Sequence, residues 1–296
     1  MVKSNYWIVH QQACERGERC YVDPDTGYYV FTRVALAKRK KCCGCGCRHC
    51  PFAHDEVDNK VASIKQPAIL HRRSLQKAFP KQVNVLFWSG GKDSFLALRA
   101  WIQEQQKKKE EDFLDSIVLL TTFDVNSRIV AHQEIQISDI QRQAIHLDIT
   151  LIAVPLHPES NYLERIQTGL DVLEANSNIQ SLIFGDLHLE HIKQWRDEHL
   201  KELGVPLRYP LWKTPYKDLY TDLVNSGVSC VVSACIGSKD IPSIQGISEG
   251  AVFDENFIHK VEQKDWDIFG ENGEFHTLAE VWSAPVHRAL GLKKIR

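Results

Sequence analysis

Short apolar runs alternate with amphipathic stretches from Val83 to about residue 234. The apolar runs are typical of buried strands, and the stretches between them repeat apolar residues at helical spacing. Strands are predicted at 83–88, 116–123, 149–154, 179–184 and 228–234, with helices ending near 106, 147, 175 and 203 and another starting at 214–215. This alternation predicts an α/β fold with a doubly wound, Rossmann-like parallel sheet covered by helices on both faces.

The segments on either side of this region are patterned differently. Residues 1–75 form a Cys-rich, basic module with short strand-like pieces such as 27–32, and a weakly patterned connector precedes Val83. After residue 234 the alternation stops, and 235–296 is predicted to extend the sheet domain rather than to fold alone. We therefore expect a metal-binding module at 1–75, an α/β domain at 83–234, and a C-terminal extension at 235–296 that contributes to the substrate site.

The composition is that of a soluble globular protein, with 43% hydrophobic and 25% charged residues. No apolar run is long enough to span a membrane and no export signal is evident, so we expect a cytoplasmic protein without a membrane partner. The net charge of −2 conceals an asymmetry, because residues 1–80 contain 14 Lys and Arg against 7 Asp and Glu. The basic module is suited to an RNA contact, although a solvated face without a partner explains the same charges.

Cysteine is concentrated in the basic module, which holds seven of the nine cysteines within its first 50 residues. In a chain without an export signal, this density indicates a metal site rather than disulfides. The motif Cys47-x-x-Cys50 on a Gly-bearing loop predicts Zn²⁺ or an iron–sulfur cluster. The expected ligands are Cys42, Cys43, Cys47 and Cys50. Neighbouring Cys45, His49 and His54 are alternative ligands, and a reduced cluster without metal is a further alternative.

The strand predicted at 83–88 ends in Ser89-Gly90-Gly91-Lys92-Asp93-Ser94, directly before a predicted helix. The glycines let backbone amides converge on an anion, while the helix N-terminus and Lys92 add positive charge. Asp93 is out of place in an anion site unless Mg²⁺ is bound as well. The spacing differs from a Walker A loop and from a GxGxxG turn. We therefore predict a phosphate site with Mg²⁺, the alternative being an ordinary glycine-containing turn.

This segment resembles the SGGxDS signature of the PP-loop ATP pyrophosphatase superfamily, whose members have an adenine nucleotide α-hydrolase fold. The resemblance implies that residues 89–94 hold the triphosphate of ATP together with Mg²⁺, and that Lys92 and Asp93 take part in catalysis. It also implies that the substrate attacks the α-phosphate, so that pyrophosphate leaves. Catalysis would then consist of positioning and charge neutralisation.

Three further segments resemble the diphthine–ammonia ligase-like family, over about residues 83–290. They are TTFDVNSRIVAHQEIQISDIQRQA, FGDLHLEHIKQWRDEHLKELGVPLRYPLW and FGENGEFHT. The resemblance implies an ATP-dependent enzyme that adenylylates a carboxylate and then forms an amide with ammonium. Eukaryotic and archaeal members act on diphthine of translation elongation factor 2, and bacterial relatives share the motifs without that substrate. The expected substrate is therefore this elongation factor or a small carboxylate.

Two of these segments contain candidate site residues. Gly185 and Asp186 follow a predicted strand, where open α/β sheets place their ligands, and are expected to contact ATP or its metal; a turn aspartate is the alternative. In GENGEFHT, an exposed hairpin does not explain why so many polar groups surround two glycines. The resemblance implies catalytic roles, such as holding ammonium and accepting its proton, for Glu271, Glu274 and His276, and substrate contacts for Asn272, Gly273 and Thr277.

One departure leaves the substrate open. Family members usually carry Asp-Pro-Cys before this Gly-Glu, whereas the chain has Asp267-Ile268-Phe269. The segment from Cys20 to His54 resembles a small family of uncharacterised domains. A second possible function is a PP-loop enzyme that transfers sulfur to tRNA with the help of the cysteine cluster. An ATP-binding sensor would explain the 89–94 segment but not the carboxylates of GENGEFHT.

Overall fold

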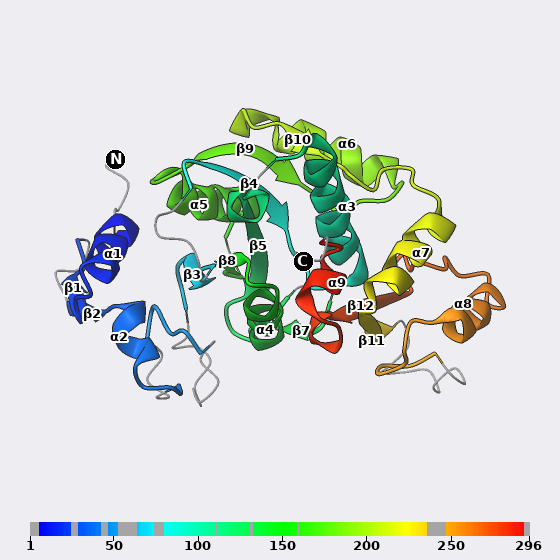
Figure 1. The fold of residues 1–296 in the computed structure, drawn as a ribbon, viewed down its shortest axis with the longest axis horizontal. Helices are drawn as coiled ribbons and strands as arrows, with labels where there is room; N and C mark the ends of the chain where they lie inside the picture. Colours follow the sequence, from blue (N-terminus) through cyan, green and yellow to red (C-terminus); the bar gives the residue numbers. More distant parts are fainter. Residues whose placement is uncertain are drawn as a thin grey trace.

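The computed structural model describes residues 6–24, 29–42, 47–52, 64–73, 80–110, 112–130, 133–158, 160–235 and 247–292. A six-stranded sheet with the order β10-β9-β4-β5-β8-β3 forms its centre (Figure 1). The strands are β3 Ala68–His71, β4 Gln82–Phe87, β5 Ile117–Asp124, β8 Thr150–Leu156, β9 Asn178–Ile183 and β10 Leu207–Arg208. Neighbours run parallel except β3, which pairs antiparallel with β8. The predicted α/β fold with a Rossmann-like sheet is confirmed.

Helices cover both faces of this sheet. One face packs against α3 Lys92–Lys108 and α4 Ile137–Leu147, and the other against α5 Tyr162–Glu174. Along β5, Leu119 belongs to the first core, whereas Val118 and Leu120 belong to the second. Successive strand residues point to opposite faces, which explains why strands buried on both sides are apolar throughout.

The order of the strands determines where a ligand can bind. The chain builds β4, β5 and β8 in one direction and then returns to place β9 and β10 on the other side of β4. In open α/β sheets, ligands bind at the carboxyl ends of the strands at such a reversal. The carboxyl ends of β4 and β9 lead into residues 89–94 and 185–186, so the topology brings these two segments to the same edge.

The N-terminal elements lie beside the β3 edge of the sheet (Figure 1). They are α1 Tyr6–Glu15, the antiparallel hairpin of β1 Cys20–Val22 and β2 Tyr29–Phe31, and α2 Arg33–Ala37. Thr32 begins α2, with its Oγ1 accepting a hydrogen bond from the Ala35 N–H (3.2 Å). The strand-like piece at 27–32 is observed as β2. Neither α1 nor β3 was predicted, and β3 lies in the weakly patterned connector.

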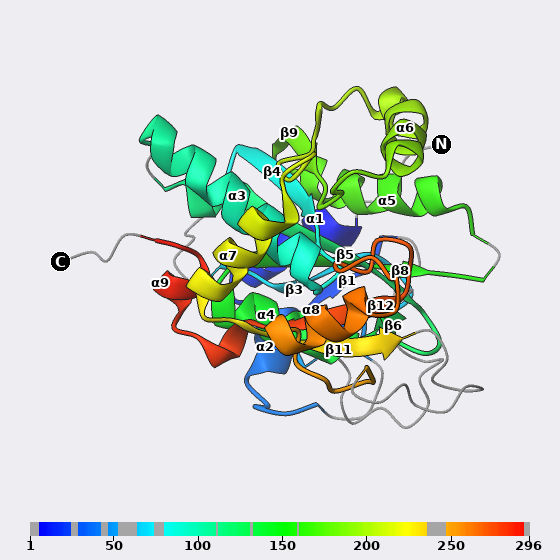
Figure 2. The ribbon, with the colours of Figure 1, turned by 90° about the vertical axis from the view of Figure 1, so that its right-hand side faces the viewer.

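The C-terminal part forms a separate two-stranded sheet. Its strands, β11 Ser229–Cys235 and β12 Phe275–Glu280, pair antiparallel. The helices α7 Tyr216–Ser226, α8 Glu255–Glu262 and α9 Val286–Ala289 accompany it, and Figure 2 shows β11, β12 and α8 grouped together. The strand predicted at 228–234 is thus present but lies outside the parallel sheet. It pairs across the predicted boundary at 234/235 with a strand of the extension.

Some element ends differ from the sequence-based prediction. The helix predicted to end near 106 continues as α3 to Lys108, and the helix predicted to end near 203 is split into α6 Glu190–His199 and the short 3₁₀ helix η3 Lys201–Leu203. Gly204 then ends this region in the left-handed conformation, with φ +65°. The remaining short elements are η2 Phe113–Ser116, β6 Ile129–Val130, β7 Ile135–Gln136 and η4 Val281–Ser283. Among the described helices, none is long and apolar enough to cross a membrane.

Candidate active site

The loop at 89–94 makes a tight turn from β4 into α3. Gly90 has φ +84°, and a Cβ on Gly91 would lie 2.9 Å from both the Thr277 carbonyl and the Gln133 side chain. Ser94 Oγ donates to the Gly91 carbonyl (3.0 Å). The helix starts without a side-chain cap, and within the described residues the N–H groups of Asp93 and Ser94 make no hydrogen bond. Such amides at a helix N-terminus are the donors that phosphate oxygens use.

Gln143 of α4 holds this loop from behind. Its Nε2 donates to the carbonyl oxygens of Gly90 (2.8 Å) and Ala279 (2.7 Å), and its Oε1 accepts from Trp88 Nε1 (2.7 Å). The side chain is completely buried. Since a buried amide that satisfies three partners is costly to replace, Gln143 joins β4, the loop and β12 into one unit.

The strand β12 runs directly alongside the loop. The Ala279 N–H donates to the Gly90 carbonyl (2.9 Å), and the Lys92 N–H donates to Thr277 Oγ1 (3.1 Å). Thr277 is 2% exposed, so its hydroxyl supports the loop instead of facing solvent. The C-terminal extension therefore supports the loop directly.

Lys92 points away from solvent into an aromatic cage. Its ammonium lies 5.2 to 5.8 Å from the ring centres of Phe253, Phe269 and Phe275, and 2.9 Å from Asp93 Oδ2. The other carboxylate oxygen, Asp93 Oδ1, is buried without a hydrogen-bond partner. A buried carboxylate oxygen without a donor is an unsatisfied acceptor, and hard cations such as Mg²⁺ prefer oxygen ligands of this kind. Asp93 thus fits the predicted Mg²⁺.

A pocket of about 760 Å³ opens at this edge of the sheet. Ser89, Asp93 and Ser94 line it at the loop, and Gly185, Asp186 and Glu271 contribute further groups. An apolar and aromatic wall completes it, formed by Phe87, Trp88, Leu120, Val130, Leu156, Tyr162, Phe184, Ile192 and Trp195. Its size and its mixture of an apolar wall with a few polar groups are those of a small-molecule site.

Gly185 and Asp186 have different roles in this pocket. A Cβ on Gly185 would lie 2.9 Å from the backbone carbon and oxygen of Asp93, so only glycine lets the end of β9 approach the loop so closely. Asp186 is held by a bidentate ion pair with Arg196 of α6 (2.7 and 3.2 Å). The predicted contact of Asp186 with ATP or metal stays a prediction, and Arg196 is a charged group of the pocket that the sequence did not single out.

The loop before β12 is organised by two carboxylates. Glu274, which is 7% exposed, accepts hydrogen bonds from the Asp267 N–H (2.9 Å) and from the Asn272 N–H (3.0 Å). Asp267 in turn accepts from the Glu271 N–H (3.2 Å) and from the Tyr216 hydroxyl (2.8 Å). Both carboxylates therefore hold the loop in place, and Glu274 positions Asp267 and Asn272.

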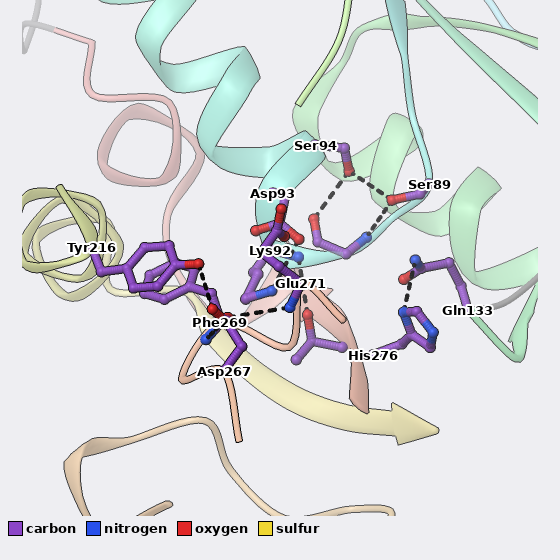
Figure 3. A network of polar contacts seen from close by, with 12 residues as sticks. Ser89, Lys92, Asp93, Ser94, Gln133, Tyr216, Asp267, Phe269, Glu271 and His276 are labelled. Atoms are coloured by element: carbon purple, nitrogen blue, oxygen red, sulfur yellow. Dashed lines mark hydrogen bonds and ion pairs between the residues drawn. The ribbon is translucent and has the colours of Figure 1, made fainter. Parts of the chain in front are cut away.

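Glu271 is presented to the pocket by this loop. Burial raises the pKa of its carboxyl to about 8, and the negative charges of Asp93, Asp267 and Asp186 add to the rise, while Lys92 opposes it. Figure 3 shows Glu271 next to Asp93 and Lys92, with Asp267 and Tyr216 beside them. A carboxyl with a pKa near neutrality is suited to accepting or donating a proton during a reaction.

His276, Asn272 and Gly273 are the remaining predicted residues of this segment. His276 Nδ1 is 3.3 Å from Gln133 Nε2, on the opposite side of the site from Glu271 (Figure 3). Asn272 is exposed and Gly273 adopts φ +84° with open space around it. Phe269, at the position where the family usually has a cysteine, is 1% exposed and stacks on Tyr216 with ring centres 4.5 Å apart.

Residues 82–207 match the family described as the diphthamide synthase N-terminal domain, and residues 9–56 match a family of unknown function, DUF5522. The first match begins with β4 and contains the 89–94 loop and Gly185-Asp186. Over this segment the chain is similar to the diphthamide synthase N-terminal domain family. Its members are PP-loop proteins, and the chain is accordingly an ATP-using enzyme of the PP-loop superfamily joined to a DUF5522 segment. The residues from 267 to 277 lie outside both matches.

Within the DUF5522 segment, the structure brings two predicted metal ligands together. The Cys42 and Cys50 sulfurs are 3.8 Å apart and both residues are buried, with Cys47 packed against them. Cys43, Cys45 and His54 lie outside the described residues, and among the described ones no group of three ligating side chains is found. His49 Nε2 is 2.8 Å from the Tyr21 hydroxyl, so this nitrogen serves internal packing. The four-cysteine site stays a prediction.

Proposed function

We propose that this chain is a cytoplasmic ATP-dependent ligase that adenylylates a carboxylate and then converts it to an amide with ammonium, releasing AMP and pyrophosphate. The observation that carries the proposal is the shared pocket. The 89–94 loop of the diphthamide synthase-like domain and Glu271 of the C-terminal extension line the same 760 Å³ space. A nucleotide on the loop would therefore present its phosphates to a titratable carboxyl.

Several groups of the pocket support an ATP site. The free N–H groups of Asp93 and Ser94, together with the Ser89 and Ser94 hydroxyls, would bind the triphosphate at the start of α3. The aromatic wall offers Phe87, Phe184 and Tyr162 to the adenine base. Asp93 would hold Mg²⁺, which neutralises phosphate charge when it is bound. Lys92 would fix the Asp93 carboxylate through their ion pair and so act on the phosphates indirectly.

The first step joins the substrate to the nucleotide. A carboxylate oxygen of the substrate attacks the α-phosphorus of ATP, and the bond from this phosphorus to the bridging oxygen breaks, so that pyrophosphate leaves. Oriented amides on the loop stabilise the charge that develops on the phosphate oxygens. No protein nucleophile is required.

The second step forms the amide. Ammonia attacks the acyl carbon, the bond from this carbon to the AMP oxygen breaks, and the nitrogen must lose a proton. Glu271 is the group that would accept it, since its raised pKa makes the ionised carboxylate a stronger base than an ordinary glutamate. We infer a supporting role for Glu274, through the loop, and for His276 on the opposite wall.

The carboxylate substrate is either diphthine on translation elongation factor 2 or a small molecule. Phe269 replaces the cysteine usual in the diphthine–ammonia ligase-like family and fills its place with a buried ring that also faces Lys92. Because this change alters the surroundings of Lys92, both substrate classes have to be tested. Asn272 and Gly273, at the exposed end of the loop, are the residues proposed to meet the substrate.

The test uses ATP labelled in the α- and γ-phosphates, Mg²⁺ and ammonium, with either diphthine-bearing elongation factor or a panel of small carboxylates. Formation of labelled AMP and pyrophosphate in step with amide product, seen by mass spectrometry, is the expected result. Release of ADP and phosphate would refute the mechanism. Glu271→Gln should keep ATP binding but lose amide formation about 100-fold or more, whereas Glu202→Gln on the exposed η3 surface should behave as wild type.

Sulfur transfer to tRNA is less well supported. None of the described cysteines lines the pocket. Cys42 and Cys50 belong to the module beside β3, which is separated from β4 by β5 and β8. Incorporation of labelled sulfur into tRNA by the purified protein would nevertheless decide in its favour.

A further inference from the structure

The outer face of the β1–β2 hairpin exposes large apolar side chains. The register pairs Val22 with Tyr29 and Tyr21 with Val30. Tyr21 and Val30 turn inward to the core, so the alternating residues turn outward. The outward side chains of Val22, Tyr29 and Phe31 are 48%, 78% and 39% exposed. A two-stranded hairpin that presents two aromatic rings to solvent is unusual unless the rings contact a partner.

Positive charge surrounds these rings. The guanidinium groups of Arg19 and Arg39 lie 5.5 and 5.3 Å from the centre of the Phe31 ring. The exposed segment Lys38-Arg39-Lys40-Lys41 follows α2 directly. In the part of the chain that the structure describes, none of these five basic side chains forms an ion pair, whereas nearby Arg16 is paired with Glu18 (2.7 Å). The charges are therefore available to an anionic partner.

The combination of rings and unpaired charge restricts the kind of partner. A solvated face without a partner explains the lysines, but it leaves the Tyr29 ring exposed to water at a cost in free energy. An apolar protein surface would cover the rings, but it would leave the basic side chains without anionic partners. Single-stranded nucleic acid satisfies both, since its bases stack on aromatic rings and its phosphates pair with Arg and Lys. Cation–π contacts hold Arg19 and Arg39 beside Phe31, where a phosphate next to a stacked base would lie.

We propose that the outer face of the β1–β2 hairpin, together with residues 38–41, binds single-stranded nucleic acid. Tyr29 supplies the principal stacking surface because it is the most exposed ring, and Phe31 a second one. The five basic side chains supply the phosphate contacts. The proposal does not depend on the ligase reaction, since the surface lies in the DUF5522 segment and shares no residue with the pocket.

The affinity should depend steeply on salt. Each phosphate contact to a single strand contributes about −0.7 to the slope of log K against log salt concentration. Five contacts would give a slope of about −3.5, and Arg39→Gln should reduce it by about 0.7. Tyr29→Ser should weaken binding about 5-fold to 150-fold, the range expected for the loss of one stacked base, and should leave the slope unchanged.

The experiment measures fluorescence anisotropy of labelled uridine and thymidine oligomers of about 12 nucleotides with the full-length protein. Binding of either single strand that is weakened in Tyr29→Ser and in Phe31→Ser supports the proposal, and the difference between the oligomers reports the preferred sugar. The matched control is Val224→Ser in α7, which should bind as wild type, because Val224 is an apolar residue whose exposure (55%) lies between those of Phe31 and Tyr29. Unaltered binding by both hairpin variants, tighter binding to a duplex, or binding only to anionic lipid vesicles would overturn it.

Discussion

Replacing Glu271 by glutamine is expected to stabilise the ligand-free protein, increasingly so as the pH rises from about 5 to about 8. Burial, reinforced by the negative charges of Asp93, Asp267 and Asp186, raises the pKa of Glu271 from 4.5 to about 8. Between these values the unfolded chain has already ionised this carboxyl while the folded protein keeps it protonated. Wild-type stability therefore falls with rising pH in this window, and glutamine avoids the loss because it does not ionise.

The size of the effect follows from the two pKa values. Each pH unit in the window costs the wild type up to ~1.4 kcal/mol of unfolding free energy relative to the variant, so the ceiling between about pH 5 and pH 8 is ~4 kcal/mol. Glu271 is partly exposed, and solvent screening reduces this to about half. For a chain of this length, ~2 kcal/mol corresponds to a difference of about 4 °C in Tm.

The assay is thermal unfolding of both proteins followed by circular dichroism, without nucleotide or Mg²⁺, at intervals from about pH 5 to pH 9. The Tm of Glu271→Gln should exceed that of wild type by a margin that widens to about pH 8 and is constant above it. Glu202→Gln, on the exposed η3, should keep a constant offset from wild type. A margin for Glu271→Gln that stays constant or narrows between pH 5 and pH 8 would refute the description of the Glu271 environment.

Three further predictions concern the loop at 89–94. Gln143→Leu should lower the unfolding free energy by about 2–4 kcal/mol, because the Ala279 carbonyl and Trp88 Nε1 lose Gln143 as a partner and the Gly90 carbonyl keeps only the Ala279 N–H. Urea denaturation measures this loss, and an unchanged midpoint would contradict the role of Gln143. Gly185→Ala should cost about 1–3 kcal/mol in the same measurement, because its Cβ would meet the Asp93 backbone at 2.9 Å; wild-type stability would show that the contact relaxes freely. Asp93→Asn should weaken Mg²⁺-dependent ATP binding at least about tenfold in calorimetric titration, and equal affinity with and without Mg²⁺ in wild type would contradict it.

The sheet and the loop at its edge were predictable because both depend on local chemistry. Each parallel strand is buried on two faces, so its apolar run stands out from the polar turns around it. Gly90 and Gly91, directly before Lys92, likewise predict a turn in which the backbone can come close to a ligand. Helix α1 was not predicted because its apolar residues follow no clear helical period. Strand β3 was not predicted because its four residues are too few to show a recognisable pattern of apolar and polar positions.

The partners of the candidate residues were not predictable, because they depend on contacts between distant segments. Lys92 was expected to face the phosphates, and nothing local indicates that three phenylalanines from residues 253–275 surround it. Thr277 was expected to meet the substrate, yet its hydroxyl supports the Lys92 N–H across 185 positions of sequence. Nothing in the sequence around Gln143 indicates that this glutamine of an amphipathic helix binds the loop at 89–94. Only the tertiary structure assigns these roles.

The antiparallel strand β3 has a consequence for any attempt to separate the two parts of the chain. It is supplied by the connector between the DUF5522 segment and the PP-loop domain, and it covers the outer side of β8 along Leu151, Ile152 and Ala153. A fragment starting at Val83 would leave the backbone groups of this apolar strand open to pairing with another molecule. We therefore expect the N-terminal segment to protect this edge of the sheet from pairing with a second molecule, and a fragment of the PP-loop domain to stay monomeric only if it begins before Ala68.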